Sequence, residues 1–129
     1  MAEYGYRSLN VWQKAKTLAT DVYRLTDSDA IKRDFSLIDQ WRRSAVSVPS
    51  NIAEGDEGKS DKDSIRFFHI AKGFLAELAA QLEIARDVGY FTTAQVEPLI
   101  SSCAELGKML GALIRARSHP APEAPRPRP

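Results

Sequence analysis

The sequence predicts an all-α protein, an up-down-up-down antiparallel four-helix bundle, on three observations. In four separate stretches the apolar residues recur at alternating gaps of three and four, the spacing that aligns side chains along one face of a helix. The links between these stretches are short, and short links join neighbouring helices that run in opposite directions. Apolar residues nowhere alternate at period two for long, so no strand is expected.

The first helix is expected over about 9–26. Ser8 and Asn10 are both good N-caps near its start, and the polar run 27–29 ends it. Leu9 and Trp12 open its apolar side. The core face that follows consists of Ala15, Leu18, Val22 and Leu25.

The second helix is expected over about 35–57, with Asp34 as its N-cap, and it carries two stripes. The apolar stripe consists of Ile38, Trp41, Ala45, Val48 and Ile52. The neighbouring polar stripe consists of Gln40, Ser44, Ser47, Asn51 and Glu54. A merely solvated face would carry more Lys and Glu, so the polar stripe is a candidate functional seam.

Pro49 lies inside this second helix. A proline there removes one backbone donor and crowds the carbonyl of Ala45, which costs roughly 3 kcal/mol in an ordinary helix. We expect a kinked helix in which water or the hydroxyl of Ser44 or Ser47 satisfies the freed carbonyl. The alternative is two short helices broken at Pro49.

The third helix is expected over about 61–88, after a turn at 58–60. Ser60 and Asp63 resemble a capping box, and Gly89 follows as a C-cap. An unbroken heptad seam gives its core face: Phe68, Ala71, Leu75, Leu78, Leu82 and Ala85. Four further apolar residues lie outside this seam and are candidates for a subunit interface: Phe67, Ile70, Phe74 and Ile84. Two alternatives remain: the N-terminal segment could cover Ile70 and Ile84, or they could be scattered surface apolar residues.

The fourth helix is expected over about 93–117. Thr92 and Gln95 form a second capping box, and Pro98 lies in the first two turns, where a proline is tolerated better. Its heptads consist of Val96, Leu99, Cys103, Leu106, Leu110 and Leu113. Residues 1–117 therefore form the predicted bundle, and the Pro- and Arg-rich segment 118–129 is predicted to be a disordered tail.

Composition places the chain among ordinary cytoplasmic proteins. With 129 residues, 43% of them hydrophobic and 27% charged, it fits one domain with one core. The single cysteine, Cys103, excludes an internal disulfide and, like Trp12 and Trp41, falls on a predicted core stripe. No segment approaches the roughly 20 apolar residues of a membrane span, and no signal peptide is recognisable, so a cytoplasmic location is expected.

Charge is distributed unevenly along the chain. Residues 7–43 contain eight Lys or Arg and five Asp or Glu, whereas residues 54–97 contain five and nine. Such asymmetry suits a head-to-tail contact between copies, in which a basic part meets an acidic part. Solvated faces with a chance imbalance would give the same counts.

Catalytic and metal-binding signatures are weak. The chain has two histidines, His69 and His119, too few for a di-iron bundle, and it has no glycine-rich phosphate loop. The enzyme alternative is a Mg-dependent all-α nucleotide pyrophosphohydrolase, which needs pairs of acidic residues at helical spacing. Glu54 and Glu57 supply one pair, and only the 83/87 pair could supply another. We therefore expect no enzyme activity, no metal and no cofactor.

A nucleic-acid role is a second possibility for the N-terminal half. Arg42 and Arg43 could neutralise phosphates together with other basic residues nearby in sequence: Lys14, Arg24, Lys32 and Arg33. The signal is not specific, because residues 1–117 contain sixteen basic and sixteen acidic side chains, whereas dedicated nucleic-acid binders are usually clearly basic.

One stretch resembles a known family. The residues Arg43, Ser44, Ala45, Ser47, Pro49 and Asn51 to Gly55 resemble the signature of bacterial four-helix bundle proteins encoded in intervening sequences of 23S rRNA genes. That family is related to the accessory variability protein of diversity-generating retroelements. The resemblance extends from about Tyr6 to Arg115, with one departure at Phe74, where a small polar residue is common. It implies a pentameric ring that contacts RNA or DNA and a reverse-transcriptase-like protein.

The sequence as a whole predicts a non-enzymatic helical bundle that self-assembles and serves as a scaffold for nucleic acid or a protein partner. The residues chosen for the functional seam are Arg42, Arg43, Ser47, Asn51 and Glu54. The competing interpretation of these five residues is a polar network between helices or subunits that sets register and binds no ligand.

Overall fold

The computed structural model describes residues 5–118, and the predicted tail lies almost wholly outside them. Within this range the chain forms a short 3₁₀ helix and four α-helices, and no strand. Their bounds are η1 Gly5–Ser8, α1 Asn10–Thr26, α2 Phe35–Asp56, α3 Asp61–Asp87 and α4 Thr93–Ser118. Each α-helix begins and ends within one residue of its expected range.

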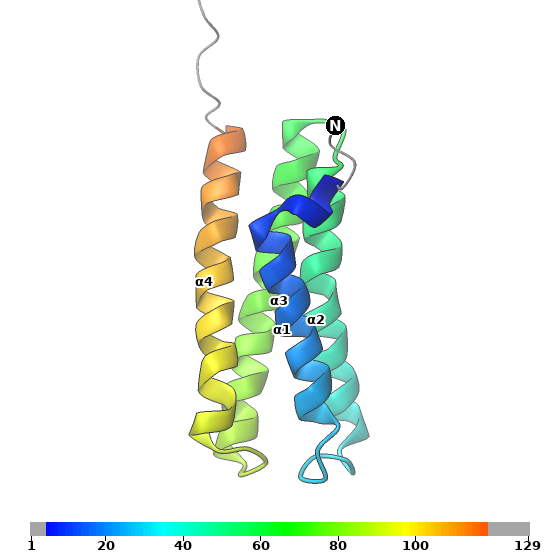
Figure 1. Ribbon diagram of the computed structural model, residues 1–129, viewed down its shortest axis with the longest axis vertical. Coiled ribbons are helices and arrows are strands. Elements are labelled where there is room, and N and C mark those ends of the chain that lie inside the picture. Colours follow the sequence, from blue (N-terminus) through cyan, green and yellow to red (C-terminus); the bar gives the residue numbers. More distant parts are fainter. Residues whose placement is uncertain (1–4, 119–129) are drawn as a thin grey trace, which may run out of the picture.

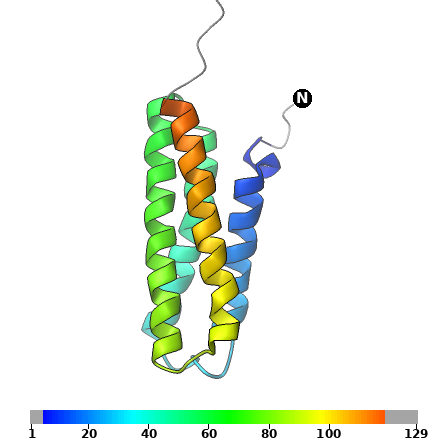
Figure 2. The ribbon, with the colours of Figure 1, turned by 90° about the vertical axis from the view of Figure 1, so that its left-hand side faces the viewer.

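The four helices form an all-α bundle in which successive helices run in opposite directions (Figures 1 and 2). Each helix packs against its neighbours in sequence, and α4 closes the bundle against α1. The loops α1–α2 and α3–α4 lie at one end, and the loop α2–α3 lies at the other end beside η1 (Figure 1).

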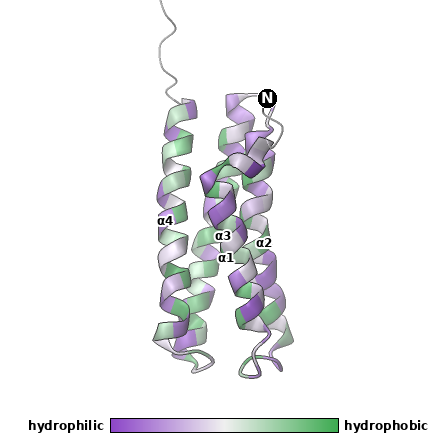
Figure 3. Cartoon of the chain, in the orientation of Figure 1, coloured by the Kyte–Doolittle hydropathy of each residue, from purple (hydrophilic) through white to green (hydrophobic). Residues whose placement is uncertain are grey.

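The apolar stripes of all four helices meet in one core. Hydrophobic and hydrophilic positions alternate around each helix in Figure 3. Trp41 is fully buried and Cys103 is 5% exposed, as predicted. Trp12 is only partly buried: it packs against the edge of the core, and the neighbouring Val11, 4% exposed, takes the fully buried position at the start of α1.

Helix ends follow the capping rules, with one exception. Asp34 accepts a hydrogen bond from the Leu37 N–H at 3.2 Å. Ser60 caps α3 by accepting from the Asp63 N–H at 3.2 Å. The reciprocal box also forms, because Thr92 N donates to Gln95 Oε1 at 2.9 Å and Gln95 N to Thr92 Oγ1 at 3.2 Å. Gly89 has a φ of +86°, the left-handed conformation of a residue after a helix end.

The exception is α1, whose N-cap is Leu9 and not Ser8 or Asn10. No side chain caps this helix. The Leu9 N–H donates to Tyr6 O at 2.9 Å, so the η1 turn satisfies one backbone donor at this helix end.

Helix α2 continues through Pro49 without a break. The expected repair by Ser47 does not occur, because the Ser47 hydroxyl donates to Arg43 O at 2.7 Å and not to the carbonyl of Ala45. The ring of Pro49 faces the surface between α1 and α2, so the core face of α2 is unaffected.

Two loop residues contribute to the core although neither lies on a helical stripe. Ile31 in the α1–α2 loop is 1% exposed, and Phe91 in the α3–α4 loop is 5% exposed. The ring of Phe91 lies 6.1 Å from that of Trp41, centroid to centroid, and seals the end of the bundle. No helix in the described part of the chain is long and apolar enough to cross a membrane.

Candidate functional site

Arg42 is an internal brace of the bundle. Its Nε donates to Thr26 Oγ1 at 2.9 Å, its Nη2 lies 3.0 Å from Asp27 Oδ1, and its guanidinium stacks 4.6 Å from the ring centroid of Tyr23. These contacts fasten the end of α1 to α2. A guanidinium held in this way has few donors left for a phosphate.

The other four residues of the predicted seam lie along α2, three of them in a chain of contacts. Arg43 is exposed and lies 3.2 Å from Asp39, one turn before it. Ser47 bonds to the carbonyl of Arg43, and Asn51 Nδ2 donates to the carbonyl of Ser47 at 2.7 Å. Glu54 is exposed one turn further along. The structure thus brings Arg43, Ser47 and Asn51 together and turns Arg42 towards α1.

Most of the predicted basic patch is neutralised locally. Besides Arg42 and Arg43, three of its members each lie beside a carboxylate. These pairs are Lys14 with Glu105, Arg24 with Asp21 at 3.8 Å, and Lys32 with Asp29 at 3.4 Å. Because five of the six basic side chains of this patch are paired, and only Arg33 is not, the patch presents a mixed surface rather than a positive one.

The carboxylates of the enzyme alternative lie at opposite ends of the molecule. Glu54 and Glu57 are at the end of α2, next to the start of α3, whereas Glu83 and Asp87 are in the last turns of α3. At 1.5 Å per residue the two pairs are roughly 30 Å apart along α3, so they cannot share a metal ion. Across residues 5–118 no group of three or more metal-ligating side chains comes together.

Neither Cys103 nor Tyr90 is placed as a reactive group. Burial raises the pKa of Cys103 to about 12, so its thiol stays protonated at neutral pH and is a poor nucleophile. The pKa of Tyr90 is raised by its 2.9 Å hydrogen bond to Asp34 and by partial desolvation. Tyr90 and Asp34 join the α3–α4 loop to the start of α2, which is a structural contact.

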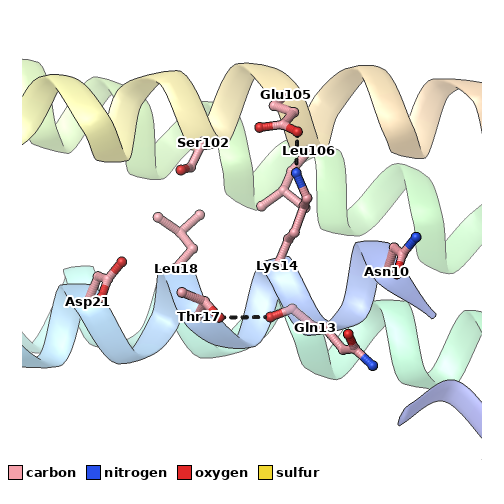
Figure 4. Close-up of a pocket in the computed structure, with 9 residues that line it drawn as sticks. All are labelled: Asn10, Gln13, Lys14, Thr17, Leu18, Asp21, Ser102, Glu105 and Leu106. Carbon is pink, nitrogen blue, oxygen red and sulfur yellow. Dashed lines mark hydrogen bonds and ion pairs between the residues drawn. The ribbon is translucent and has the colours of Figure 1, made fainter. Parts of the chain in front are cut away.

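A small polar cleft of about 280 Å³ lies between α1 and α4 (Figure 4). Lys14 and Glu105 reach across it, and Asn10, Gln13 and Asp21 line its α1 wall. The ion pair is about half exposed on both sides. An exposed pair of this kind contributes at most about 1 kcal/mol, and the cleft has no set of converging groups suited to catalysis.

A larger and more apolar groove, of about 620 Å³, lies between α1 and α2; we call it the α1–α2 groove. It is lined by Tyr6, Trp12, Lys16, Ala19, Thr20, Tyr23, Val46, Pro49, Ser50 and Ala53. Tyr6 and Trp12 meet edge to face at its upper end, with ring centroids 5.0 Å apart. Lys16 Nζ lies 5.6 Å from the Trp12 centroid. Tyr23 and Val46, at the other end, are 42% and 41% exposed.

The outward side of α3 forms a second unusual surface, which we call the α3 ridge. It consists of Ile70, Gly73, Glu77, Ala80 and Ile84, all exposed and all on one line at helical spacing. Ile70 is 36% and Ile84 53% exposed. Of the four predicted interface residues, these two are on the ridge, whereas Phe67 and Phe74 are half-buried within the chain.

The fold and these surfaces can be compared with known proteins. A family model described as "23S rRNA-intervening sequence protein" matches residues 7–112. The chain belongs to this family. A solved structure from Bacteroides thetaiotaomicron, described as a protein of unknown function from the S23 ribosomal protein family, is 26% identical with a TM-score of 0.75. The alignment covers 81% of this chain and 98% of that one. No curated protein gives a match.

For this member of the 23S rRNA-intervening sequence protein family, sequence reasoning missed the α1–α2 groove. A signal was present, because Trp12, Lys16, Ala19 and Tyr23 recur at gaps of four, three and four beside the core stripe of α1. On the opposite wall Val46, Pro49 and Ala53 recur at gaps of three and four, a weaker signal because the row is short and its side chains are small. Val46 and Ala53 are ordinary surface residues until the fold places them beside Tyr23 and Trp12.

Proposed function

We propose that this protein is a non-enzymatic scaffold that self-assembles, with five copies in a ring, and that the assembly contacts RNA, DNA or a nucleic-acid-processing protein such as a reverse transcriptase. The observation that carries self-assembly is the α3 ridge. In a four-helix bundle the outward positions of a helix face water and are usually charged. On the α3 ridge they are occupied by two isoleucines, an alanine, a glycine and a single carboxylate, whereas charged residues such as Arg66, Lys72 and Glu83 are exposed at its end and beside it.

Gly73 strengthens this argument. A glycine in a helix interior costs about 1 kcal/mol relative to alanine. Within the chain nothing requires it, because a Cβ at Gly73 would meet no atom of another element within 4 Å. A glycine between exposed Ile70 and Glu77 lets another helix approach closely, and a second copy of the chain would use that space.

The nucleic-acid part of the proposal is supported by family membership and by exposed basic side chains. The family description refers to 23S rRNA and that of the solved relative to a ribosomal protein family. Arg33 and Arg43 are both exposed at the α1–α2 loop and the outer side of α2. A ring would repeat them in every copy, so that a near-neutral chain could present several cations to one nucleic acid.

Light scattering after size exclusion tests the assembly. We expect a mass near five times 14.3 kDa, about 72 kDa, at micromolar protein and moderate salt. A mass of one chain at all concentrations would contradict the scaffold proposal.

The nucleic-acid role is tested separately by salt-dependent binding to structured RNA and to single-stranded DNA. Arg33→Glu and Arg43→Glu are the informative variants, because both side chains are exposed and neither braces the fold. Arg42 is unsuitable because its loss would loosen α1. Binding that neither variant weakens would contradict the role given to these arginines. Magnesium-dependent release of pyrophosphate from nucleotides would instead support the enzyme alternative.

A further inference from the structure

We propose that the α3 ridge of one copy docks into the α1–α2 groove of the next copy, with Glu77 of the ridge paired to Lys16 of the groove. This inference rests on the self-assembly proposed above and adds the two surfaces and their polarity. It makes the contact heterologous, so that every copy uses both surfaces and a ring closes if the rotation allows.

The two surfaces are complementary in shape and polarity. The ridge is a convex row on one helix, and the groove is concave and mainly apolar, with aromatic rings and Val46 along its walls. Fourteen residues separate Ile70 from Ile84, about 21 Å along α3, and eleven separate Trp12 from Tyr23, about 17 Å along α1. With Tyr6 beyond Trp12, the groove is long enough to receive the ridge.

The charges lie at matching positions. Glu77 is the middle of the ridge, seven residues from each isoleucine, and among residues 5–118 it forms no ion pair. Lys16 likewise has no carboxylate partner in the described part of the chain, and Tyr23 follows it by seven residues. When Glu77 meets Lys16, an isoleucine therefore lies about 10 Å away, level with Tyr23 and Val46.

A symmetric contact between two α3 ridges fits the charges less well. Around a two-fold axis near the middle of the ridge, Glu77 would face Glu77 of the second copy, and like charges brought together at an interface are costly. The groove offers the opposite charge. The observations therefore favour groove and ridge as partners over ridge and ridge.

The test uses two full-length variants, Val46→Glu for the groove and Ile84→Glu for the ridge. Both side chains are exposed, so each variant should retain the circular dichroism of the wild type. Each variant alone is expected to be a monomer by light scattering. An equimolar mixture is expected to form a one-to-one dimer and no larger species, because only the intact ridge of one variant and the intact groove of the other can combine.

A charge exchange provides the second arm. Lys16→Glu and Glu77→Lys should each weaken assembly, and the double variant K16E/E77K should restore at least part of it, because the exchanged charges meet again across the contact. The matched control is Lys108→Glu, an exposed lysine on α4 away from both surfaces. It should leave the mass unchanged.

Several results would overturn the proposal. If Ile84→Glu is monomeric while Val46→Glu keeps the wild-type mass, the ridge pairs with itself or the groove receives something else, such as residues 119–129. If the mixture of variants stays monomeric, the two surfaces are not partners. Either result leaves self-assembly itself intact, whereas a monomeric wild type would remove both proposals.

Discussion

Gly55 of α2 lies directly against the ring of Phe68 of α3. A Cβ at this position would lie 2.5 Å from Cε1 of Phe68, a buried ring that would have to shift. The sequence showed only a glycine near the end of a helix, which is usually a sign of a cap. A glycine is needed there because the ring of Phe68 from another helix packs against it, and this contact depends on tertiary packing.

The variant Gly55→Ala should therefore lower the free energy of unfolding by about 1–3 kcal/mol, because the core must shift to admit one methyl group. The matched control is Gly107→Ala in α4, where an added Cβ meets nothing within 4 Å. That change should raise stability by up to about 1 kcal/mol through helix propensity. Urea denaturation of both variants measures the difference, and equal stability would contradict the packing described.

Arg42 and Arg43 are adjacent in sequence but differ in function within the fold. Arg42→Ala should destabilise the chain by about 1–3 kcal/mol, because it removes bonds to Thr26 and Asp27 and leaves the Tyr23 ring uncovered. Arg43→Ala should change stability by less than about 0.5 kcal/mol, because its pair with Asp39 is exposed. Thermal unfolding compares them, and an equal loss from both would contradict the brace.

Cys103 should react slowly with a thiol reagent in the folded state. Burial disfavours the thiolate and raises the pKa of Cys103 from 9.0 to about 12. Between pH 9 and pH 12 the thiol of the folded protein therefore stays protonated, whereas the thiol of the unfolded chain ionises. The reaction rate at pH 9 should then rise sharply in denaturant. Fast reaction of the folded protein would show that the side chain is not buried as described.

Among the helices, α2 shows best how far sequence reasoning extends. Its bounds and its buried apolar stripe were predictable, because period and capping are local properties. The function of its polar stripe was not, since Ser47 and Asn51 bond to the helix backbone and Arg42 turns to α1. Which neighbour a side chain faces is decided only when the bundle forms.

Pro49 leads to a prediction about the stability of α2. Replacing it by alanine restores an N–H that can donate to the carbonyl of Ala45, so Pro49→Ala should raise the unfolding free energy by about 1–3 kcal/mol. Because Pro49 lines the α1–α2 groove, the same change should weaken self-association. Denaturation at low concentration gives the first effect and light scattering the second. A less stable variant would contradict the cost assigned to Pro49.

At the scale of the whole molecule, fold class and helix order followed from the sequence, whereas the surfaces did not. The heptads of α3 and α4 specify a core in any bundle, and the exposed isoleucines of the ridge were visible as exceptions to them. The rows that line the groove were visible in the sequence, but their meeting was not, because the walls come from α1, α2 and η1. The pairing of Lys14 with Glu105 and of Arg42 with Asp27 also depends on three-dimensional placement.

The most direct test of the central claim, that the outer face of α3 is a self-association surface, is sedimentation equilibrium of Gly73→Ala beside Gly107→Ala. Both glycines are in helix interiors, and at each of them an added Cβ would have no neighbouring atom within 4 Å. Both changes should therefore raise the stability of the single chain by about 1 kcal/mol. Only Gly73→Ala should weaken association, by roughly tenfold or more, because its methyl group holds the partner away from the ridge. Unchanged association in Gly73→Ala would contradict the claim.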